Sequence, residues 1–523
     1  MEYSSLALEA HRQDRLADAL RYYRLFLGEQ PQSAEGWFAL GMLYHGKIHD
    51  LAGARHCYAT SRVLQPGNGQ LHGHLGTLFA ELGEERKALP YLRRAIADGG
   101  DKFIHSELAC AHLRLGEISQ ARAAAAHYLS LQPDDYFAPY MAAWVALGAG
   151  EPREALRHVT DAVALDPTMP MPVALRGMLL WQLGQSEGSR QALHEMVVLQ
   201  TTQIASGSSD GELLQAQRQW REIRLGAKSQ LGVAQDTPVN FLTMGVGLGD
   251  QYIFVELLAA YKRLHPDIPL VVVSSLAEKW RTLYDGAADL FMPLDNESIF
   301  RLAGSNRMFP DHPYSPFFPW IGSLLNFYDL RQLSKFQLGL PQNAVAEGPK
   351  VPVALRQQAE RMFHELGGKP GRSVLISNKS NSNPNMPDSW WLALIGSLQA
   401  AGFTLFQNTL NPRNPNPGDR LPGTIPVDVP IEQVIPFCEA AGFFIGMRSG
   451  LCDLLGTARV RSKAVYVKKR YPRSDRYPVS LWADGQSGTS LKRTYGNPLC
   501  DDISVAGDAE FDPSLLADWI NPA

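Results

Sequence analysis

The chain has 523 residues, with 49 lysines and arginines against 53 aspartates and glutamates, and a net charge of −4. This length exceeds what one hydrophobic core holds, so about two to four domains are expected. The near balance of charge argues against a general nucleic-acid binder. Five cysteines without Cys-x-x-Cys or Cys/His pairing fit a reduced cytoplasmic compartment and no structural zinc. The N-terminus lacks the pattern of a secretory signal, and no apolar run predicts a membrane span.

The first two hundred residues repeat with a period of about 34 residues. Each unit carries one small residue in its first half and a second about twelve residues later, and most units end at proline, which stops a helix. Trp37 and Tyr44 flank Leu40-Gly41 as the aromatic residues of the tetratricopeptide (TPR) pattern do. The recurring residues are Ala7, Gly41, Gly76, Ala109, Ala143 and Gly177, then Ala19, Ala54, Ala88, Ala121, Ala155 and Ser189, and finally Pro31, Pro66, Pro133 and Pro167. Residues 1–200 therefore resemble a TPR solenoid of about six helix pairs.

Repeat arrays of this kind bury their faces only against neighbouring repeats and present a groove, usually to a peptide or protein. The resemblance implies a protein partner in the TPR groove. Packing on the next domain, or self-association into a homo-oligomer, is the alternative use of the same surface.

Residues 201–236 change character and read as a linker with a capping helix. The Ser/Gly cluster at 206–211 predicts a loop, and the polar helix predicted at about 212–228 is expected to cap the last repeat. From Val239 the repeat period ends and strands alternate with helices, which predicts α/β layers. We expect one lobe over 237–350 and a second over 351–523, giving an α + α/β fold class.

The first lobe begins with a strand over 239–244 that runs into a glycine turn containing Gly247, Gly249 and Asp250. The spacing GxGxGD differs from the dinucleotide-binding GxGxxG, and the next strand ends in serine, so an NAD enzyme is disfavoured. Asp250 follows a parallel strand, where open α/β sheets build their sites, and a carboxylate there can deprotonate an acceptor hydroxyl. A helix N-cap is its alternative role. His312, in the proline-rich and aromatic loop 309–320, is a minor candidate base.

The second lobe begins with a strand over 373–377, followed by a polar loop that opens with Asn378 and Lys379. A lysine and amides directly after a buried strand can bind phosphate as a point charge and neutral donors. A polar turn without a ligand is the alternative interpretation.

The most informative stretch is 443–456, where an apolar run ends at Gly446 and a helix begins near Leu451. The N–H groups of Ser449, Gly450 and Leu451 are expected at a helix N-terminus, where anions bind, and Gly450 allows close approach. Arg448 is expected to grip phosphate oxygens with two parallel hydrogen bonds. Asp453 suits the positive end of the helix dipole. An ordinary strand–turn–helix corner with a surface arginine is the alternative.

The two α/β lobes with their linker resemble a GT-B glycosyltransferase, and more closely its heptosyltransferase-like branch, over 241–266, 373–391 and 431–456. The resemblance implies that Asp250 is the catalytic base, that Lys379 binds phosphate, and that the amides of 449–451 hold the nucleotide-sugar. The family has an acidic residue where Arg448 stands and a histidine where Asp453 stands. GT-B enzymes generally stabilise the leaving diphosphate without metal, so neither metal nor cofactor is expected.

A TPR array fused to a GT-B unit resembles bacterial protein O-glycosyltransferases, including those acting on flagellin, and O-GlcNAc transferases. The resemblance implies a cytoplasmic enzyme that transfers a sugar from a nucleotide-sugar to a hydroxyl, on a protein recruited by the TPR groove. A non-catalytic TPR scaffold with a degenerate GT-B domain is one alternative, and a polysaccharide or lipid-glycan transferase is another. The sequence names neither the nucleobase, sugar and acceptor nor the stereochemical outcome.

Overall fold

The computed structural model describes residues 2–206, 210–244, 247–299, 324–380, 385–409, 420–471, 481–483, 488–507 and 509–520. The chain forms two compact units, Met1–Pro172 with Lys469–Pro472, and Val173–Lys468 with Arg473–Ala523. In the part of the chain so described, no helix is both long and apolar enough to cross a membrane.

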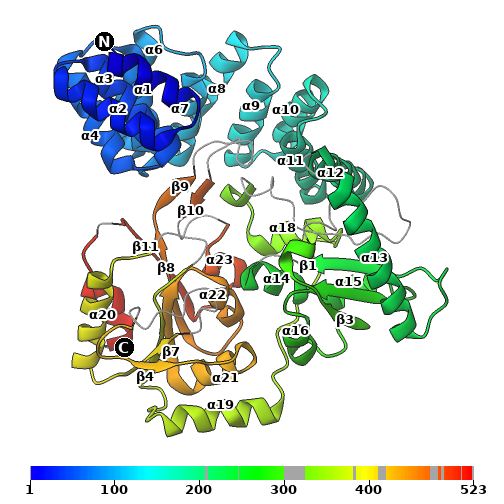
Figure 1. Cartoon of the computed structure of the whole chain (residues 1–523). Helices are drawn as coiled ribbons and strands as arrows, with labels where there is room; N and C mark the ends of the chain where they lie inside the picture. The colour runs from blue at the N-terminus through cyan, green and yellow to red at the C-terminus, as the bar shows by residue number, and fades with distance from the viewer. Residues whose placement is uncertain are drawn as a thin grey trace. The chain divides into compact units, whose positions relative to one another are not determined.

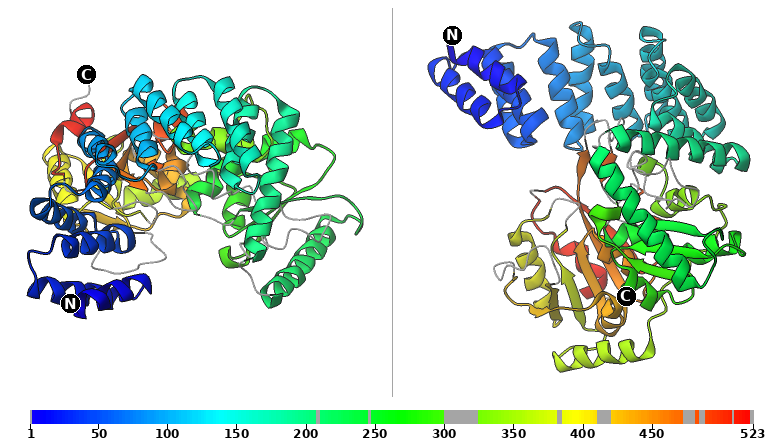
Figure 2. Two further views of the ribbon diagram at one scale, coloured as in Figure 1. Left: turned by 90° about the horizontal axis from the view of Figure 1, so that it is seen from above. Right: turned by 45° about the vertical axis from the view of Figure 1, so that its right-hand side comes forward.

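The first unit is a stack of antiparallel helix pairs, shown in Figure 1 and from two further sides in Figure 2. This confirms the predicted repeat array. The pairs are α1 (Glu2–Arg12) with α2 (Leu16–Glu29), α3 (Ala34–Leu43) with α4 (Leu51–Leu64), α5 (Gly69–Glu81) with α6 (Glu85–Ala97), α7 (Ile104–Arg114) with α8 (Ile118–Leu131), and α9 (Phe137–Gly148) with α10 (Pro152–Leu165).

The small residues of the repeat set the distance between the two helices of a pair. A Cβ atom on Gly41 would lie 2.5 Å from the Tyr58 ring, and one on Gly76 would lie 2.5 Å from Leu92. A side chain at either position would therefore force its neighbour on the second helix to shift. The matching alanines of the second helices, Ala54 among them, are fully buried.

The second repeat contains one inserted residue, because Gly41 and Gly76 are one residue further apart than Ala7 and Gly41. The chain absorbs it in a π-helical turn, Tyr44–Ile48, which ends at His49 with a φ of 59°. Such a turn takes up one extra residue without ending the helix abruptly. It places His45 inside the array.

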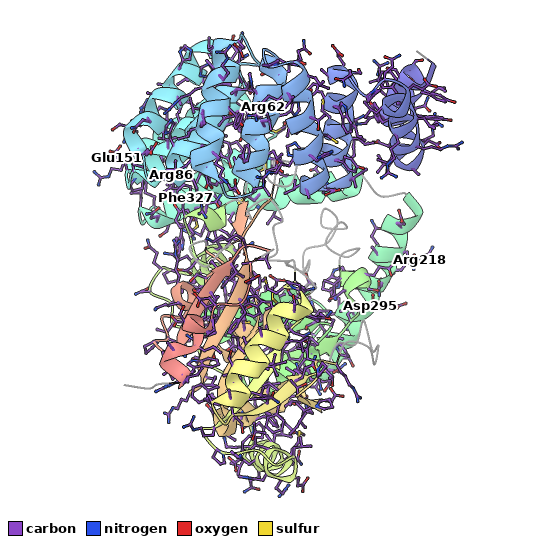
Figure 3. The ribbon with its side chains drawn as sticks, turned by 90° about the vertical axis from the view of Figure 1, so that its left-hand side faces the viewer. Arg62, Arg86, Glu151, Arg218, Asp295 and Phe327 are labelled. Carbon is purple, nitrogen blue, oxygen red and sulfur yellow. The ribbon has the colours of Figure 1, made fainter. Side chains whose placement is uncertain are left out.

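Polar contacts also join neighbouring repeats at the surface, and Figure 3 labels two of the residues that take part, Arg62 and Glu151. The Arg62 guanidinium lies 5.6 Å from the centre of the Tyr91 ring of the next repeat. Arg122 pairs with Glu154 at 3.0 Å and also with Glu151. These groups are partly exposed, so the pairs contribute little, and apolar packing between repeats supplies most of the stability.

The sixth helix pair, α11 (Pro170–Gln182) and α12 (Ser186–Ser206), belongs from Val173 onward to the second unit. Gly177, the small residue of this pair, lets two neighbours approach closely. A Cβ on Gly177 would lie 2.9 Å from both Ala192 of α12 and Phe336 of α18 (Leu330–Gln337). The Trp181 Nε1–H donates to the Leu340 carbonyl at 2.7 Å. The sixth pair therefore packs on α18, and the compact unit ends before the boundary predicted at residue 200.

The helix expected to cap the repeats, α13 (Asp210–Leu231), packs on the first sheet. Trp220 is 0 % exposed and meets the Phe241 ring edge-on, with ring centres 4.7 Å apart. This parallel sheet has the order β1 (Asn240–Met244), β2 (Leu270–Ser274), β3 (Leu290–Pro293). Its other face packs on α14 (Leu248–Val255), α15 (Leu258–Leu264) and α16 (Ala277–Leu283).

The second sheet is parallel, with the order β11-β8-β7-β4-β5-β6. Its strands are β4 (Ser373–Ser377), β5 (Thr404–Asn408), β6 (Ile425–Val427), β7 (Gly442–Met447), β8 (Arg461–Val467) and β11 (Cys500–Val505). One face packs on α20 (Asp388–Ala400), and the other on α19 (Val353–Glu365), α21 (Ile431–Ala441) and α22 (Gly450–Leu455). Further elements are β9 (Lys469–Tyr471), β10 (Leu481–Ala483), α23 (Leu491–Tyr495), the 3-10 helix Pro513–Leu516 and α24 (Ala517–Ile520).

One hydrophobic core runs through both sheets. It contains Leu242 and Val272 of the first sheet together with Leu375 and Phe444 of the second. The prediction of parallel α/β layers is confirmed. Each sheet also has a separate apolar cluster on its other face, with α13 on the first sheet and α20 on the second.

Candidate functional site

The order of the second sheet creates a switch point between β4 and β7. From β4 the chain builds outward through β5 and β6, then returns to β7 and builds in the other direction through β8 and β11. Open α/β sheets bind ligands outside the carboxyl ends of the strands at such a point. Asn378 follows β4 there, and Arg448 follows β7.

The two glycine turns singled out in the sequence meet in the structure. A Cβ on Gly450 would lie 2.3 Å from the Gly249 nitrogen, and a Cβ on Gly249 would lie 2.3 Å from Asp453 Oδ2. The N-terminal ends of α14 and α22 therefore touch through backbone atoms, which only glycines permit. Asp250, the next residue of α14, is exposed. The structure thus brings Asp250 close to the turn formed by residues 449–451.

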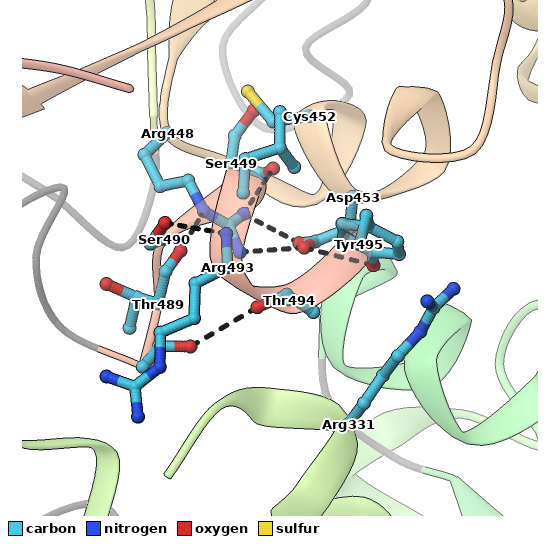
Figure 4. A network of polar contacts seen from close by, with 12 residues as sticks. Arg331, Arg448, Ser449, Cys452, Asp453, Thr489, Ser490, Arg493, Thr494 and Tyr495 are labelled. Carbon is cyan, nitrogen blue, oxygen red and sulfur yellow. Dashed lines mark hydrogen bonds and ion pairs between the residues drawn. The ribbon is translucent and has the colours of Figure 1, made fainter. Parts of the chain in front are cut away.

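Arg448 is 6 % exposed, and its guanidinium is held on every side (Figure 4). Nη1 and Nη2 donate to the two carboxylate oxygens of Asp453, each at 2.7 Å. Nε donates to the Thr489 carbonyl and Nη1 also to the Ser449 carbonyl, both at 2.9 Å. The two parallel bonds expected to reach phosphate go to Asp453, and we correct that prediction accordingly.

The Arg448–Asp453 ion pair joins the residue after β7 to α22 and so stabilises the turn between them. Burial alone would lower the pKa of the Arg448 guanidinium, but the Asp453 carboxylate raises it well above its usual value. Tyr495 Oη donates to Asp453 Oδ1 at 3.3 Å. Asp453 therefore acts mainly as the partner of Arg448, in place of the helix-dipole role that its position in the sequence suggested.

A second buried ion pair lies nearby and was missed by the sequence interpretation. Arg331 Nε and Nη2 donate to the Glu256 carboxylate at 2.6 and 2.8 Å, and Glu256 is 0 % exposed. Burial raises the pKa of the Glu256 carboxyl, and Arg331 opposes that rise. One signal was available, because Glu256 is the one charged residue in the apolar run 252–260.

Tyrosines complete the contact between the two sheets. The Arg331 guanidinium lies 4.5 Å from the centre of the Tyr495 ring (Figure 4). Tyr252 of α14 stacks obliquely on Tyr495 with ring centres 6.3 Å apart, and its hydroxyl lies 2.9 Å from Thr457 Oγ1. No local pattern marks these residues, since they come from separate segments.

Asn378 is 3 % exposed and presents a polar group at the switch point. The Leu421 N–H donates to Gln407 Oε1 at 2.8 Å, so Gln407 Nε2 is the end that donates to Asn378 Oδ1, at 3.1 Å. This order leaves Asn378 Nδ2 as a buried donor with no acceptor among the residues described. A buried donor in that state costs about 1–3 kcal/mol, so it favours a ligand oxygen.

The other predicted residues are distributed around this edge. Lys379 is exposed, and Ser380 Oγ donates to the Arg448 carbonyl at 2.9 Å, which joins the Asn378 loop to the turn after β7. Leu451 is buried in the core, and Gly247 has room for a side chain, since a Cβ there would lie 3.6 Å from its nearest contact, Asp250 Oδ2. His312 lies outside the described residues. Within the described ranges, no three His, Cys, Asp or Glu side chains converge in a way that could hold a metal ion.

Fold and site together define a helical repeat array followed by an α/β unit with a doubly wound sheet. The sequence model of the tetratricopeptide repeat family matches residues 140–203, which correspond to the fifth and sixth helix pairs. Arrays of such repeats usually present a groove to a peptide or protein, so the match suggests protein partners for this chain.

Solved structures similar to the chain include several repeat proteins. PilW, a widely conserved type IV pilus biogenesis factor, is 16 % identical with a TM-score of 0.35, covering 37 % of this chain and 90 % of PilW. MamA is 22 % identical with a TM-score of 0.30, covering 32 % and 90 %. YrrB, a TPR protein with an unusual peptide-binding site, is 23 % identical with a TM-score of 0.29, covering 32 % and 85 %. The comparison with curated protein sequences gave no match.

Proposed function

We propose that the chain is a metal-independent glycosyltransferase, which transfers a sugar from a nucleotide-sugar to a hydroxyl group of a protein held by the repeat array. The observation that carries this proposal is the switch point between β4 and β7, with the buried donor of Asn378 beside it. The strand order β6-β5-β4-β7-β8-β11 is the order of doubly wound nucleotide-binding sheets, whose ligands bind at that position.

On the donor side, Asn378 Nδ2 would donate to an oxygen of the nucleotide, and Lys379 would supply positive charge. The backbone of Ser449, Gly450 and Leu451 borders the same edge. Donors fixed before the reaction stabilise the negative charge that develops on a leaving diphosphate. Arg448 would act through Asp453, by holding the turn in place, without touching the diphosphate.

On the acceptor side, Asp250 would take the proton of the attacking hydroxyl. Its carboxylate is exposed at the start of α14, next to Gly249, which meets Gly450. A general base must stand within hydrogen-bond reach of the proton it removes. Asp250→Asn should abolish transfer with little effect on nucleotide affinity, whereas unchanged turnover would remove Asp250 from this role.

A second candidate function is a protein-binding scaffold whose α/β unit is not catalytic. The specific observation in its favour is the closed contact between the N-terminal ends of α14 and α22, where Gly249 touches Gly450 and the Arg448–Asp453 pair is buried. A donor that needs the space between these turns could bind only if they separate.

Isothermal titration of the full chain with UDP, GDP, ADP and CMP separates the two candidates. The transferase proposal expects one of these nucleotides to bind, with affinity at least about tenfold lower in Asn378→Ala, which loses a hydrogen bond to a charged group. Asn343→Ala, an exposed amide remote in sequence from β4, is the matched control and should bind normally. If no nucleotide binds and no radiolabelled nucleotide-sugar is hydrolysed or transferred, the transferase proposal is wrong and the scaffold function is supported.

A further inference from the structure

The first two repeats enclose an open cavity of about 390 Å³. Its walls come from α2, α3 and α4 and are mainly apolar, formed by Leu27, Trp37, Leu40, Tyr44 and Cys57. Cavities of about 300–1,000 Å³ with an apolar lining and a few polar groups are typical of ligand sites. The cavity lies between α2 and α4, which are the second helices of the first two helix pairs.

The cavity has a fixed aromatic wall. Trp37 Nε1–H donates to the Pro31 carbonyl at 2.9 Å, and the His56 ring meets the indole edge-on with ring centres 5.8 Å apart. On the opposite helix a Cβ on Gly28 would meet no atom within 4 Å. The indole is therefore already oriented and the space next to α2 is open, so little ordering is needed when a side chain enters.

Two basic side chains line the cavity. Arg24 and His56 line it, and within the described residues no aspartate or glutamate does. The Arg24 guanidinium makes a long hydrogen bond of 3.3 Å to the Tyr44 hydroxyl, a neutral partner. The acid that follows the π turn, Asp50, accepts the Gly53 N–H at 2.9 Å and caps α4. An apolar cavity with a guanidinium at its edge complements an apolar side chain that stands beside a carboxylate.

We propose that this cavity binds an acidic peptide segment of a partner protein. One aliphatic or aromatic side chain of the peptide lies against Trp37 and Leu40, and a neighbouring carboxylate pairs with Arg24. The site depends only on the first two repeats and does not rest on the proposed transferase activity.

The test begins with selection of a random peptide library on the immobilised full chain. We expect the enriched peptides to carry an aspartate or glutamate next to a large apolar residue. Enrichment of peptides without acidic residues, or no enrichment, would overturn the proposal.

Fluorescence anisotropy of the strongest synthetic peptide then locates the site. Arg24→Glu should weaken binding at least about tenfold, because it replaces a charge-assisted contact by repulsion. Arg21→Glu, at another exposed arginine on the same helix, should change it less than about twofold. The peptide with its carboxylate replaced by an amide should bind the unmodified chain more weakly than the acidic peptide, and the Arg24→Glu change should weaken its binding no further. Equal effects of the two arginine changes would contradict the assignment. Circular dichroism checks that both variants stay folded.

Discussion

Removing the Arg448 side chain should destabilise the α/β unit far more than a surface arginine change does. In Arg448→Met the Asp453 carboxylate stays buried and, of the side-chain partners drawn in Figure 4, keeps only Tyr495 Oη at 3.3 Å. Breaking a buried ion pair by removing one partner typically costs about 3–5 kcal/mol. Such a loss is a large share of the roughly 5–15 kcal/mol that hold a domain folded.

A change at Asp453 should lower the stability less than Arg448→Met does, so the prediction also ranks the two variants. In Asp453→Asn the guanidinium keeps its bonds to the carbonyls of Thr489 and Ser449, so part of its hydrogen bonding survives. Replacing both partners by apolar residues, in Arg448→Met with Asp453→Leu, removes both buried charges. Such replacements are often close to neutral, so the double variant should be more stable than Arg448→Met alone.

The assay is a double-mutant cycle on the full chain, made from Arg448→Met, Asp453→Leu and the double variant that combines them. Because the two units can unfold separately, hydrogen exchange of peptides spanning 442–455 reports the free energy of opening at the pair itself. Arg459→Met, an exposed arginine just beyond α22, is the control and should change this free energy by less than about 0.5 kcal/mol. If the costs of the two single changes add within about 0.5 kcal/mol in the double variant, the two residues are not coupled and the reasoning is refuted.

Three further outcomes follow from the structure. Gly450→Ala should cost about 1–3 kcal/mol in urea unfolding, because its Cβ would lie 2.3 Å from a backbone nitrogen of α14, whereas Gly247→Ala, whose Cβ has only a 3.6 Å contact, should be nearly neutral. Burial, together with His45, lowers the pKa of His74 to about 4, so the unfolded chain binds more protons than the folded chain as the pH falls below about 6.5. The free energy of unfolding of the array should therefore fall by about 2 kcal/mol between pH 7 and pH 5. An equal loss in a His74→Phe variant would contradict this prediction. Glu81→Leu leaves His45 Nε2 buried without its 3.0 Å partner and should cost about 1–3 kcal/mol in thermal unfolding, a cost that the added change His45→Leu should reduce.

Local features of the fold were predictable because their signals lie within a few residues. The strand over 373–377 has the bounds expected from its apolar run, and the strand expected over 239–244 differs by one residue. The small residues of the repeats were predictable for the same reason. The π turn was visible only as a one-residue change of the period.

Non-local features were not predictable from these patterns. The Arg448–Asp453 pair joins residues five apart, yet its role depends on burial of both groups, which a single stretch of sequence does not show. Glu256 and Arg331 are 75 residues apart in sequence. The helix α13 follows the repeats in sequence, but tertiary packing of Trp220 places it on the first sheet.

The central proposal is that the edge between β4 and β7 binds a nucleoside diphosphate, and hydrogen exchange of the full chain tests it most directly. Mass spectrometry would compare peptides covering 373–380 and 442–455 with and without saturating UDP, GDP, ADP or CDP. The account predicts slower exchange in both peptides with at least one nucleotide, and a smaller effect in Asn378→Ala. Unchanged exchange in both peptides with all four nucleotides, or protection confined to other parts of the chain, would contradict it.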